Sequence, residues 1–182
     1  MSGPGLCWQE VARSPLLARC HAASVTSGGR VYIHGGLASA EQRGPPLASL
    51  VCWDPASGAV TELDSSLARS HHTASLLPGE VWSCQRKYFA TVFTINILLS
   101  FLSRNFVGSS RKVLLLTGGW DGRARTSAVA AYSLATRSWL ELRHLEDISR
   151  PPHGLSGHSC TMIRSSLFCV LGREGGLKIQ RR

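Results

Sequence analysis

Short apolar runs separated by turn residues dominate the hydrophobic pattern of this chain of 182 residues. Near the N-terminus such runs fall at residues 21–26, 30–34, 49–54 and 59–63, and Gly, Pro, Ser and Asp separate them. Because the runs are short and consist of β-branched or apolar residues, they predict strands rather than helices. Four strands at this spacing predict one antiparallel sheet.

The same pattern returns further along the chain. The segment 17–21 (LARCH) recurs 50 residues later as 67–71 (LARSH). Each copy leads into an apolar run that ends in a glycine pair, at 35–36 in the first copy and at 118–119 in the second. An aromatic residue follows each glycine pair, and a second marker stands seven residues beyond it. A period near 50 residues predicts an architecture in which each repeat is one supersecondary unit.

A third copy is predicted near the C-terminus. In the first copy, His21 stands 14 residues before Gly35. The same distance of 14 residues separates His158 from Gly172, which places Gly172 at the first glycine position of the third copy. Arg173 then replaces the second glycine.

These features resemble the kelch repeat, in which each repeat is one four-stranded blade of a β-propeller. The shared features are an Arg and a His before the first strand, an apolar strand that ends in Gly-Gly, and a spaced aromatic pair. The residues that carry the resemblance are Arg19, His21, Gly35, Gly36, Trp53, Arg69, His71, Gly118, Gly119, Tyr132, Trp139, His158 and Gly172. We interpret all of them as structural markers, because glycines let the backbone bend and aromatic rings fill the wedge between blades.

The resemblance implies an all-β fold, an incomplete kelch β-propeller of about two and a half to three four-stranded antiparallel blades. Residues 12–66 are the predicted first blade, residues 67–149 the second, and residues 150–182 part of a third. Residues 1–11, whose end 8–11 (WQEV) is strand-like, are predicted to be the final strand of a ring-closing blade. Propellers close with about four to eight blades. We therefore expect open blade edges and self-association through them.

One segment interrupts the second repeat. From His71 to Gly118 the chain takes 47 residues where the first repeat needs 14, and the surplus falls at residues 80–110. This insert contains the uncharged run 88–102. One interpretation is a membrane-associated segment, although a spanning helix needs about 20 apolar residues. The others are a functional lid or docking loop, and a translated intervening sequence in a truncated splice or gene-model product without independent function.

Composition limits the ligand classes. The net charge of +9 raises the question of nucleic acid, but the basic residues are mostly single arginines in predicted turns, so we expect no specific nucleic-acid binding. The six cysteines show no CxxC spacing, and we expect free thiols, no metal site and no cofactor. The N-terminus lacks the apolar core of a signal peptide, which predicts a cytoplasmic or nuclear location.

The sequence favours a protein-binding module over an enzyme. It carries no nucleophile elbow, phosphate-binding glycine loop or paired carboxylates. The candidate partner contacts are Trp120, Asp121 and Arg123 in the loop 120–126, because an exposed tryptophan can anchor an interface. The loop 37–47 is the corresponding candidate in the first repeat. One family member that the chain resembles is associated with A-type cyclin binding, so the resemblance implies a cell-cycle partner.

Overall fold

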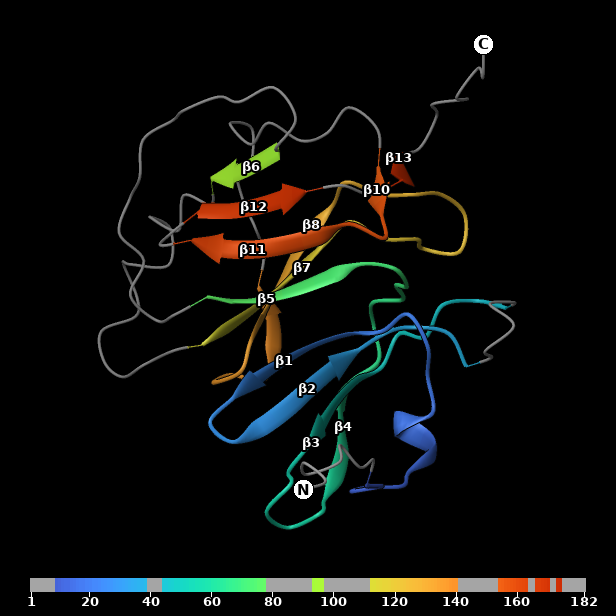
Figure 1. Ribbon diagram of the computed structural model, residues 1–182, viewed down its shortest axis with the longest axis vertical. Helices are drawn as coiled ribbons and strands as arrows, with labels where there is room; N and C mark the ends of the chain where they lie inside the picture. Colours follow the sequence, from blue (N-terminus) through green and yellow to red (C-terminus); the bar gives the residue numbers. More distant parts are fainter. Residues whose placement is uncertain are drawn as a thin grey trace, which may run out of the picture.

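The structure is a computed structural model of the 182-residue chain. The described residues are 9–38, 44–77, 93–96, 112–140, 154–163, 166–170 and 173–174. In these ranges the chain forms antiparallel β-sheets and one short 3-10 helix, η1 (Pro15–Leu17) (Figure 1). The predicted all-β fold is confirmed.

Blade 1 is a four-stranded sheet whose strands pair in the order of the sequence. Its strands are β1 (Ala23–Ser27), β2 (Arg30–His34), β3 (Leu50–Trp53) and β4 (Val60–Asp64). Gly28 and Gly29 have φ values of 59° and 75°, which the two-residue turn between β1 and β2 requires. Leu50 and Val51 on β3 are inaccessible to solvent, so the third strand contributes most to the core of this blade.

Blade 2 repeats this order with β5 (Thr73–Leu77), β7 (Val113–Thr117), β8 (Val129–Ser133) and β9 (Ser138–Leu140). Strands β5 and β7 pair directly, although the insert 80–110 separates them in sequence. All five residues of β7 are buried, which accounts for its continuous apolar pattern. Of the insert, residues 93–96 are described and the rest lies outside the described ranges.

The remaining strands form blade 3, which is assembled differently. Its main sheet contains β11 (Ser159–Ile163), β12 (Ser166–Val170) and β6 (Phe93–Asn96), paired in that order. A separate two-stranded sheet joins β10 (Leu155–Ser156) to β13 (Arg173–Glu174). Strand β6 comes from the insert and lies beside β12 in Figure 1.

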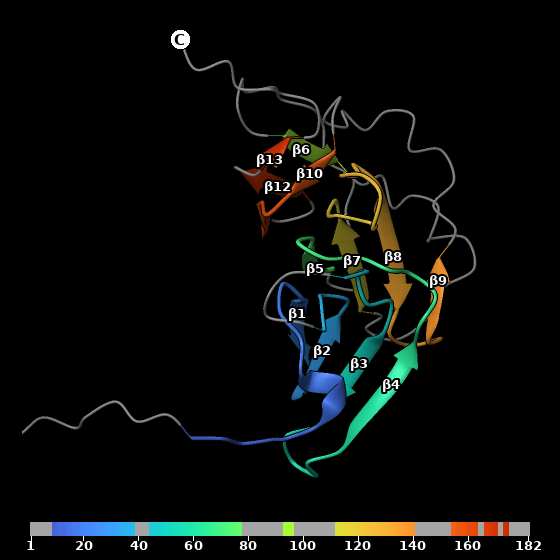
Figure 2. The same cartoon turned by 90° about the vertical axis from the view of Figure 1, so that its right-hand side faces the viewer.

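The core lies between consecutive blades. Strand β5 neighbours both β1 and β11, so the first strands of the three blades follow one another (Figure 1). Figure 2 shows the four strands of blade 1 side by side in the order β1 to β4. One buried cluster joins Leu50 of blade 1 to residues of blade 2, which are Leu114, Leu116 and Tyr132. Blades 1 and 2 therefore depend on each other to bury their apolar faces.

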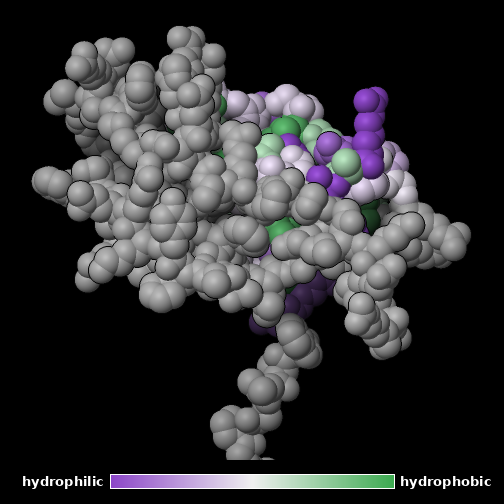
Figure 3. All heavy atoms as spheres, turned by 90° about the horizontal axis from the view of Figure 1, so that it is seen from above, coloured by the Kyte–Doolittle hydropathy of each residue, from purple (hydrophilic) through white to green (hydrophobic). Residues whose placement is uncertain are grey.

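The described surface is mixed in character. In Figure 3, the part of the surface that is coloured by hydropathy mixes hydrophilic and hydrophobic residues. Among the described residues, Val11 is the large hydrophobic side chain that stands out in solvent, at 67% exposure. Residues 9–11, the described end of the predicted ring-closing strand, have no strand partner among the described residues, so that role stays a prediction.

Candidate functional site

Arg19 holds the start of blade 1 to its glycine turn. Its Nη1 donates to the carbonyl oxygens of Gly35 at 3.1 Å and Ser49 at 3.2 Å. Its Nη2 donates to Oγ of Ser49 at 3.0 Å. Burial lowers the pKa of Arg19, and the nearby charge of Glu62 opposes that shift. The guanidinium therefore serves as a set of fixed donors to one blade.

Arg69, the corresponding residue of blade 2, joins two blades through its backbone. Its carbonyl oxygen accepts from the N–H of Gly36 at 2.8 Å, and its own N–H donates to the Leu47 carbonyl at 3.2 Å. Its Nη1 is buried without a hydrogen-bond partner. Burial lowers the pKa of Arg69, whereas the negative charge of Asp121 raises it, so the guanidinium lies within electrostatic reach of the predicted contact loop.

The glycine pairs lie where consecutive blades meet, and all four residues have positive φ: Gly35, Gly36, Gly118 and Gly119. A Cβ at Gly35 would collide with the Arg69 carbonyl oxygen, and one at Gly118 would lie 2.7 Å from that of Leu155. The N–H of Gly119 donates to the same Leu155 carbonyl at 2.6 Å. Glycine is required here because the backbones of two blades approach within hydrogen-bond distance.

A second contact between blades runs through one residue of left-handed conformation in each blade. These residues are His21 (φ 53°), His71 (φ 54°) and Gly157 (φ 63°). The N–H of His71 donates to the His21 carbonyl at 3.0 Å, and the N–H of Gly157 donates to the His71 carbonyl at 2.8 Å. The rings of His21 and His71 stack with centroids 4.0 Å apart. This backbone ladder gives successive blades the same orientation.

The ladder shows that the predicted alignment of the third repeat is wrong by one residue. Gly157, rather than His158, holds the position of His21 and His71. His158 therefore corresponds to His72, and each of these two side chains is 6% exposed. Histidine and glycine can exchange at the ladder position because both are found with positive φ, which histidine spacing alone does not reveal.

Strand register gives the same correction. In blade 1, Ala23 pairs with His34, the residue directly before the glycine pair. In blade 3, Ser159 pairs with Val170 in the same way. In sequence, Gly172 is two residues beyond Val170, as Gly36 is two residues beyond His34, so its counterpart by numbering is the second glycine rather than the first. The distance of 14 residues is the same in either alignment, because His158 and Gly172 are both displaced by one residue. Gly172 itself lies outside the described residues.

Two histidines that the sequence did not single out form a buried pair at the first blade junction. Nδ1 of His34 lies 3.0 Å from Nε2 of His72, and the rings meet edge to face. Burial lowers the pKa of His34 to about 4. Burial, and then the charges of His34 and Arg69, lower the pKa of His72 to about 3. Both imidazoles are therefore neutral at pH 7, and one N–H is shared between them.

The aromatic markers of blade 2, Tyr132 and Trp139, fill the wedge between blades 1 and 2. Nε1 of Trp139 donates to Oδ1 of Asp64, at the end of β4, at 2.8 Å. The Trp139 ring packs edge to face on Tyr132 and His34, with centroids 5.1 and 5.9 Å away. Tyr132 is fully buried, whereas Trp53, its counterpart in blade 1, is half-buried. These contacts lock the fourth strand of each blade to the other blade.

The predicted contact loop begins at this junction. Trp120 and Ser70 exchange backbone hydrogen bonds of 2.8 and 3.0 Å, and Trp120 is half-buried. Oδ1 of Asp121 accepts the backbone N–H groups of Ala124 and Arg123, both at 2.8 Å, and these bonds lower the pKa of Asp121. Asp121 thus shapes the loop, and Arg123 stands exposed at its tip.

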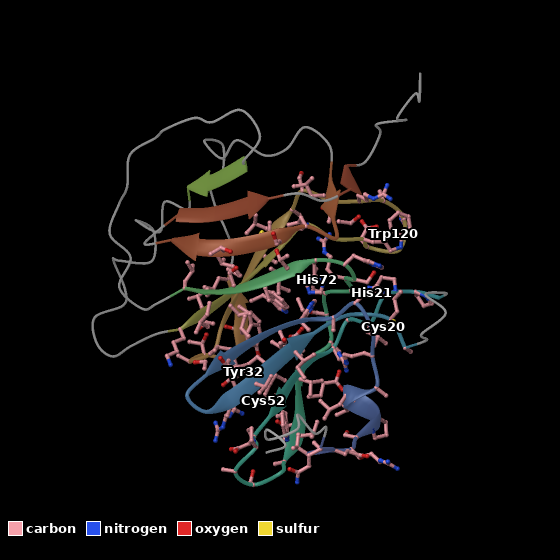
Figure 4. The ribbon with its side chains drawn as sticks, in the orientation of Figure 1. Cys20, His21, Tyr32, Cys52, His72 and Trp120 are labelled. Atoms are coloured by element: carbon pink, nitrogen blue, oxygen red, sulfur yellow. The ribbon has the colours of Figure 1, made fainter. Side chains whose placement is uncertain are left out.

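The loops of blades 1 and 2 meet. A Cβ added at Gly122 would lie 3.3 Å from Cδ of Pro46, so Gly122 of one predicted contact loop lies close to Pro46 of the other. Trp120, His21 and Cys20 lie on the same side of the molecule (Figure 4). The surface formed by 120–125 and Pro46 is the candidate contact surface.

Within the described part of the chain, no three side chains of metal-ligating type gather. A search of the same residues finds no helix long and apolar enough to cross a membrane. Cys52 is a free, buried thiol. Cys160 takes part in a disulfide, which corrects the expectation of free thiols. Cys160 stands directly opposite Cys169 in the β11–β12 register, a proximity that linear cysteine spacing does not show.

Three comparisons place the chain among known proteins. Residues 18–65 match the family model of the Kelch motif. The chain is 33% identical over 183 residues to Kelch domain-containing protein 9 of Homo sapiens, covering all of this chain and 43% of that protein. It is 34% identical over 177 residues to the Mus musculus protein of that name, covering 96% of this chain and 41% of that protein.

A solved structure shares the fold. The structure of YjhT matches with a TM-score of 0.54 and 15% sequence identity, over 88% of this chain and 36% of that chain. The resemblance to kelch repeats and the incomplete propeller fold, both predicted from the sequence, are confirmed. The chain spans less than half of the length of the relatives that it matches.

Proposed function

From its kelch-type sequence and incomplete propeller fold, we propose that the chain is a non-enzymatic scaffold that binds a protein partner through its blade loops. The observation that carries this proposal is the architecture of the contact loop. The carboxylate of Asp121 accepts hydrogen bonds from two backbone N–H groups of its own loop, and these bonds order the loop. A loop that is already ordered loses less conformational entropy on binding.

The residues that this loop presents suit a protein interface. Trp120 is half-buried and Arg123 is exposed, and Trp and Arg are the types most enriched among residues that dominate binding energy. The chain also carries a net charge of +9. Such a charge favours encounter with an acidic partner surface. We therefore infer a partner with an apolar pocket for Trp120 beside carboxylates for Arg123.

The distribution of perturbed groups supports binding rather than catalysis. The strongest pKa shifts belong to His34 and His72, which are 1% and 6% exposed. Their hydrogen bond joins two blades, and burial accounts for most of each shift. Such a pair stabilises the blade junction without meeting a substrate, since structural networks also perturb pKa values.

The identity of the partner is a finer proposal. The A-type cyclin implied by the resemblance is the first partner to test, and the cytoplasmic or nuclear location is proposed with it. The alternative is a truncated product without independent function. The two differ in folding, because a specific scaffold needs a cooperative fold that holds Trp120 in place.

Binding of purified A-type cyclin to the immobilised full chain tests the proposal. If cyclin is the partner, Trp120→Ala should raise the Kd about 10- to 30-fold, and Arg123→Ala about 5- to 10-fold. Arg30→Ala is the matched control, because Arg30 is an exposed arginine on blade 1 that pairs with Asp54 away from the loop. If the chain does not bind cyclin, cyclin is not the partner, and cross-linking in cell extract would then test for other proteins. If those proteins cross-link equally well to the Trp120→Ala variant, the loop surface is not the binding site.

A further inference from the structure

The insert contributes a strand to a blade that is distant in sequence. Strand β6 pairs with β12, opposing Phe93 to Cys169 and Asn96 to Ser166. The other side of β12 pairs with β11. In blades 1 and 2 the strand at this position is the third, β3 beside β2 and β8 beside β7. Strand β6 therefore holds the third-strand position of blade 3 (Figure 1).

Register aligns β6 with the third strands residue by residue. Ile33 and Cys169 correspond, because each directly precedes the last residue of the second strand in its blade. Ile33 pairs with Val51, and Cys169 pairs with Phe93. Phe93 therefore takes the position of Val51, and β6 as a whole takes that of residues 51–54.

The sequence of β6 fits this position. It reads FTIN, where blade 1 has VCWD at 51–54 and blade 2 has AAYS at 130–133. The first and third residues are apolar or aromatic in all three, and the last is Asn, Asp or Ser. Oδ1 of Asp54 and Oγ of Ser133 each accept a backbone N–H of the following turn, at 3.0 and 3.2 Å. Asparagine is suited to the same turn.

We propose that the insert is an internal strand donor, in which Phe93–Asn96 completes blade 3 as a substitute third strand. By pairing with β12 it covers a row of backbone N–H and C=O groups that would otherwise be an open edge. Strand β6 precedes β12 in the chain, whereas β3 and β8 follow the second strand of their own blades. Among the described residues β6 is the outer strand of this sheet, so the open edge moves from the five residues of β12 to the four residues of β6. A shorter edge strand is a weaker template for pairing with another chain.

A cross-link between β6 and β12 tests the register. Ile95→Cys combined with Leu167→Cys places two thiols on residues that pair directly. Under mild oxidation we expect an intrachain disulfide, identified as a linked peptide by mass spectrometry. The matched control is Ile95→Cys with Phe168→Cys, because adjacent strand residues point to opposite faces. Equal yields in the two variants, or links between two chains, would overturn the proposal.

Hydrogen exchange of the full chain gives an independent test. Ile95 pairs directly with Leu167, so Ile95→Pro removes a backbone donor from the β6–β12 ladder, whereas Ile95→Val keeps strand propensity. We expect Ile95→Pro to accelerate amide exchange in 166–170 at least 10-fold while 73–77 stays unchanged. Ile95→Val should leave both segments as in the parent chain. Exchange in 166–170 that is indifferent to Ile95→Pro would contradict strand donation. If the proline unfolds the whole chain, the cross-link decides the question in the folded parent sequence.

Discussion

Lowering the pH from 7 to 5 should destabilise the folded chain through the buried pair His34–His72. Their pKa values are lowered to about 4 and about 3, whereas a histidine in the unfolded chain titrates near about 6.5. Below that pH the unfolded state binds protons that the folded state excludes. The stability that the pair contributes is therefore complete above about pH 6.5 and is lost as the pH falls towards the folded pKa values.

The magnitude follows from the depressed pKa values. Below the pKa of the unfolded chain, the contribution of each histidine to the free energy of unfolding falls by about 1.4 kcal/mol per pH unit. At pH 5 this amounts to about 2 kcal/mol for each histidine and about 4 kcal/mol for the pair. Burial also lowers the pKa of His158, which adds in the same direction. Carboxylates such as Asp64 and Asp121 have lowered pKa values and lose their contribution only at more acidic pH, so this window isolates the histidines.

Urea unfolding followed by tryptophan fluorescence measures this loss, because Trp139 packs on His34. The double variant His34→Asn with His72→Gln keeps polar, uncharged partners and should lose most of the dependence between pH 7 and 5. His21→Asn is the control, because His21 is exposed and asparagine tolerates positive φ. A free energy of unfolding that changes by less than about 1 kcal/mol between these pH values in the parent chain would show that His34 and His72 do not have depressed pKa values in the folded state.

Two further substitutions, each with a comparison variant, test the blade junctions by urea unfolding at pH 7. Gly119→Ala should lower the free energy of unfolding by about 2–3 kcal/mol, because its Cβ would lie 2.7 Å from the Ser70 carbonyl oxygen at a φ of 101°. Gly58→Ala, at a φ of 72° with no atom within 4 Å, should cost about 1 kcal/mol, and equal costs would argue against crowding. Trp139→Phe should cost about 1 kcal/mol by removing the bond to Asp64. Because Asp64→Asn retains an acceptor, it should cost less, and the reverse order would count against this bond.

Much of the fold could be predicted from the sequence, because blade strands are short and their turns carry glycine. The first four apolar runs overlap β1, β2, β3 and β4. The alignment of the third repeat was wrong by one residue, since Gly157 replaces a histidine at the ladder. The pairing of β6 with β12 was also missed. Hydrophobic periodicity reports which segments are strands, but long-range pairing depends on the assembled sheet.

The candidate site was predicted in part. The sequence singled out the loop that carries Trp120, and its role as a partner contact stays a proposal. The role of Asp121 as an acceptor within its own loop was missed, because it depends on turn geometry. The buried pair His34–His72 was missed, because one member directly precedes a glycine pair and the other follows a marker histidine. A histidine in an otherwise apolar strand, such as the RVYIH of β2, is the available signal. Its partner lies 38 residues away and is defined only by the blade junction.

The scaffold proposed here requires the blades to fold cooperatively and to hold the loop 120–126 in place. Hydrogen exchange of the full chain, read by mass spectrometry strand by strand, measures whether they do. We predict slow exchange in 31–36, 113–119 and 129–140, with the ladder amides of His71 and Gly157 protected alongside them. Fast exchange throughout these segments would contradict a stable stack of blades, and with it the scaffold proposed here.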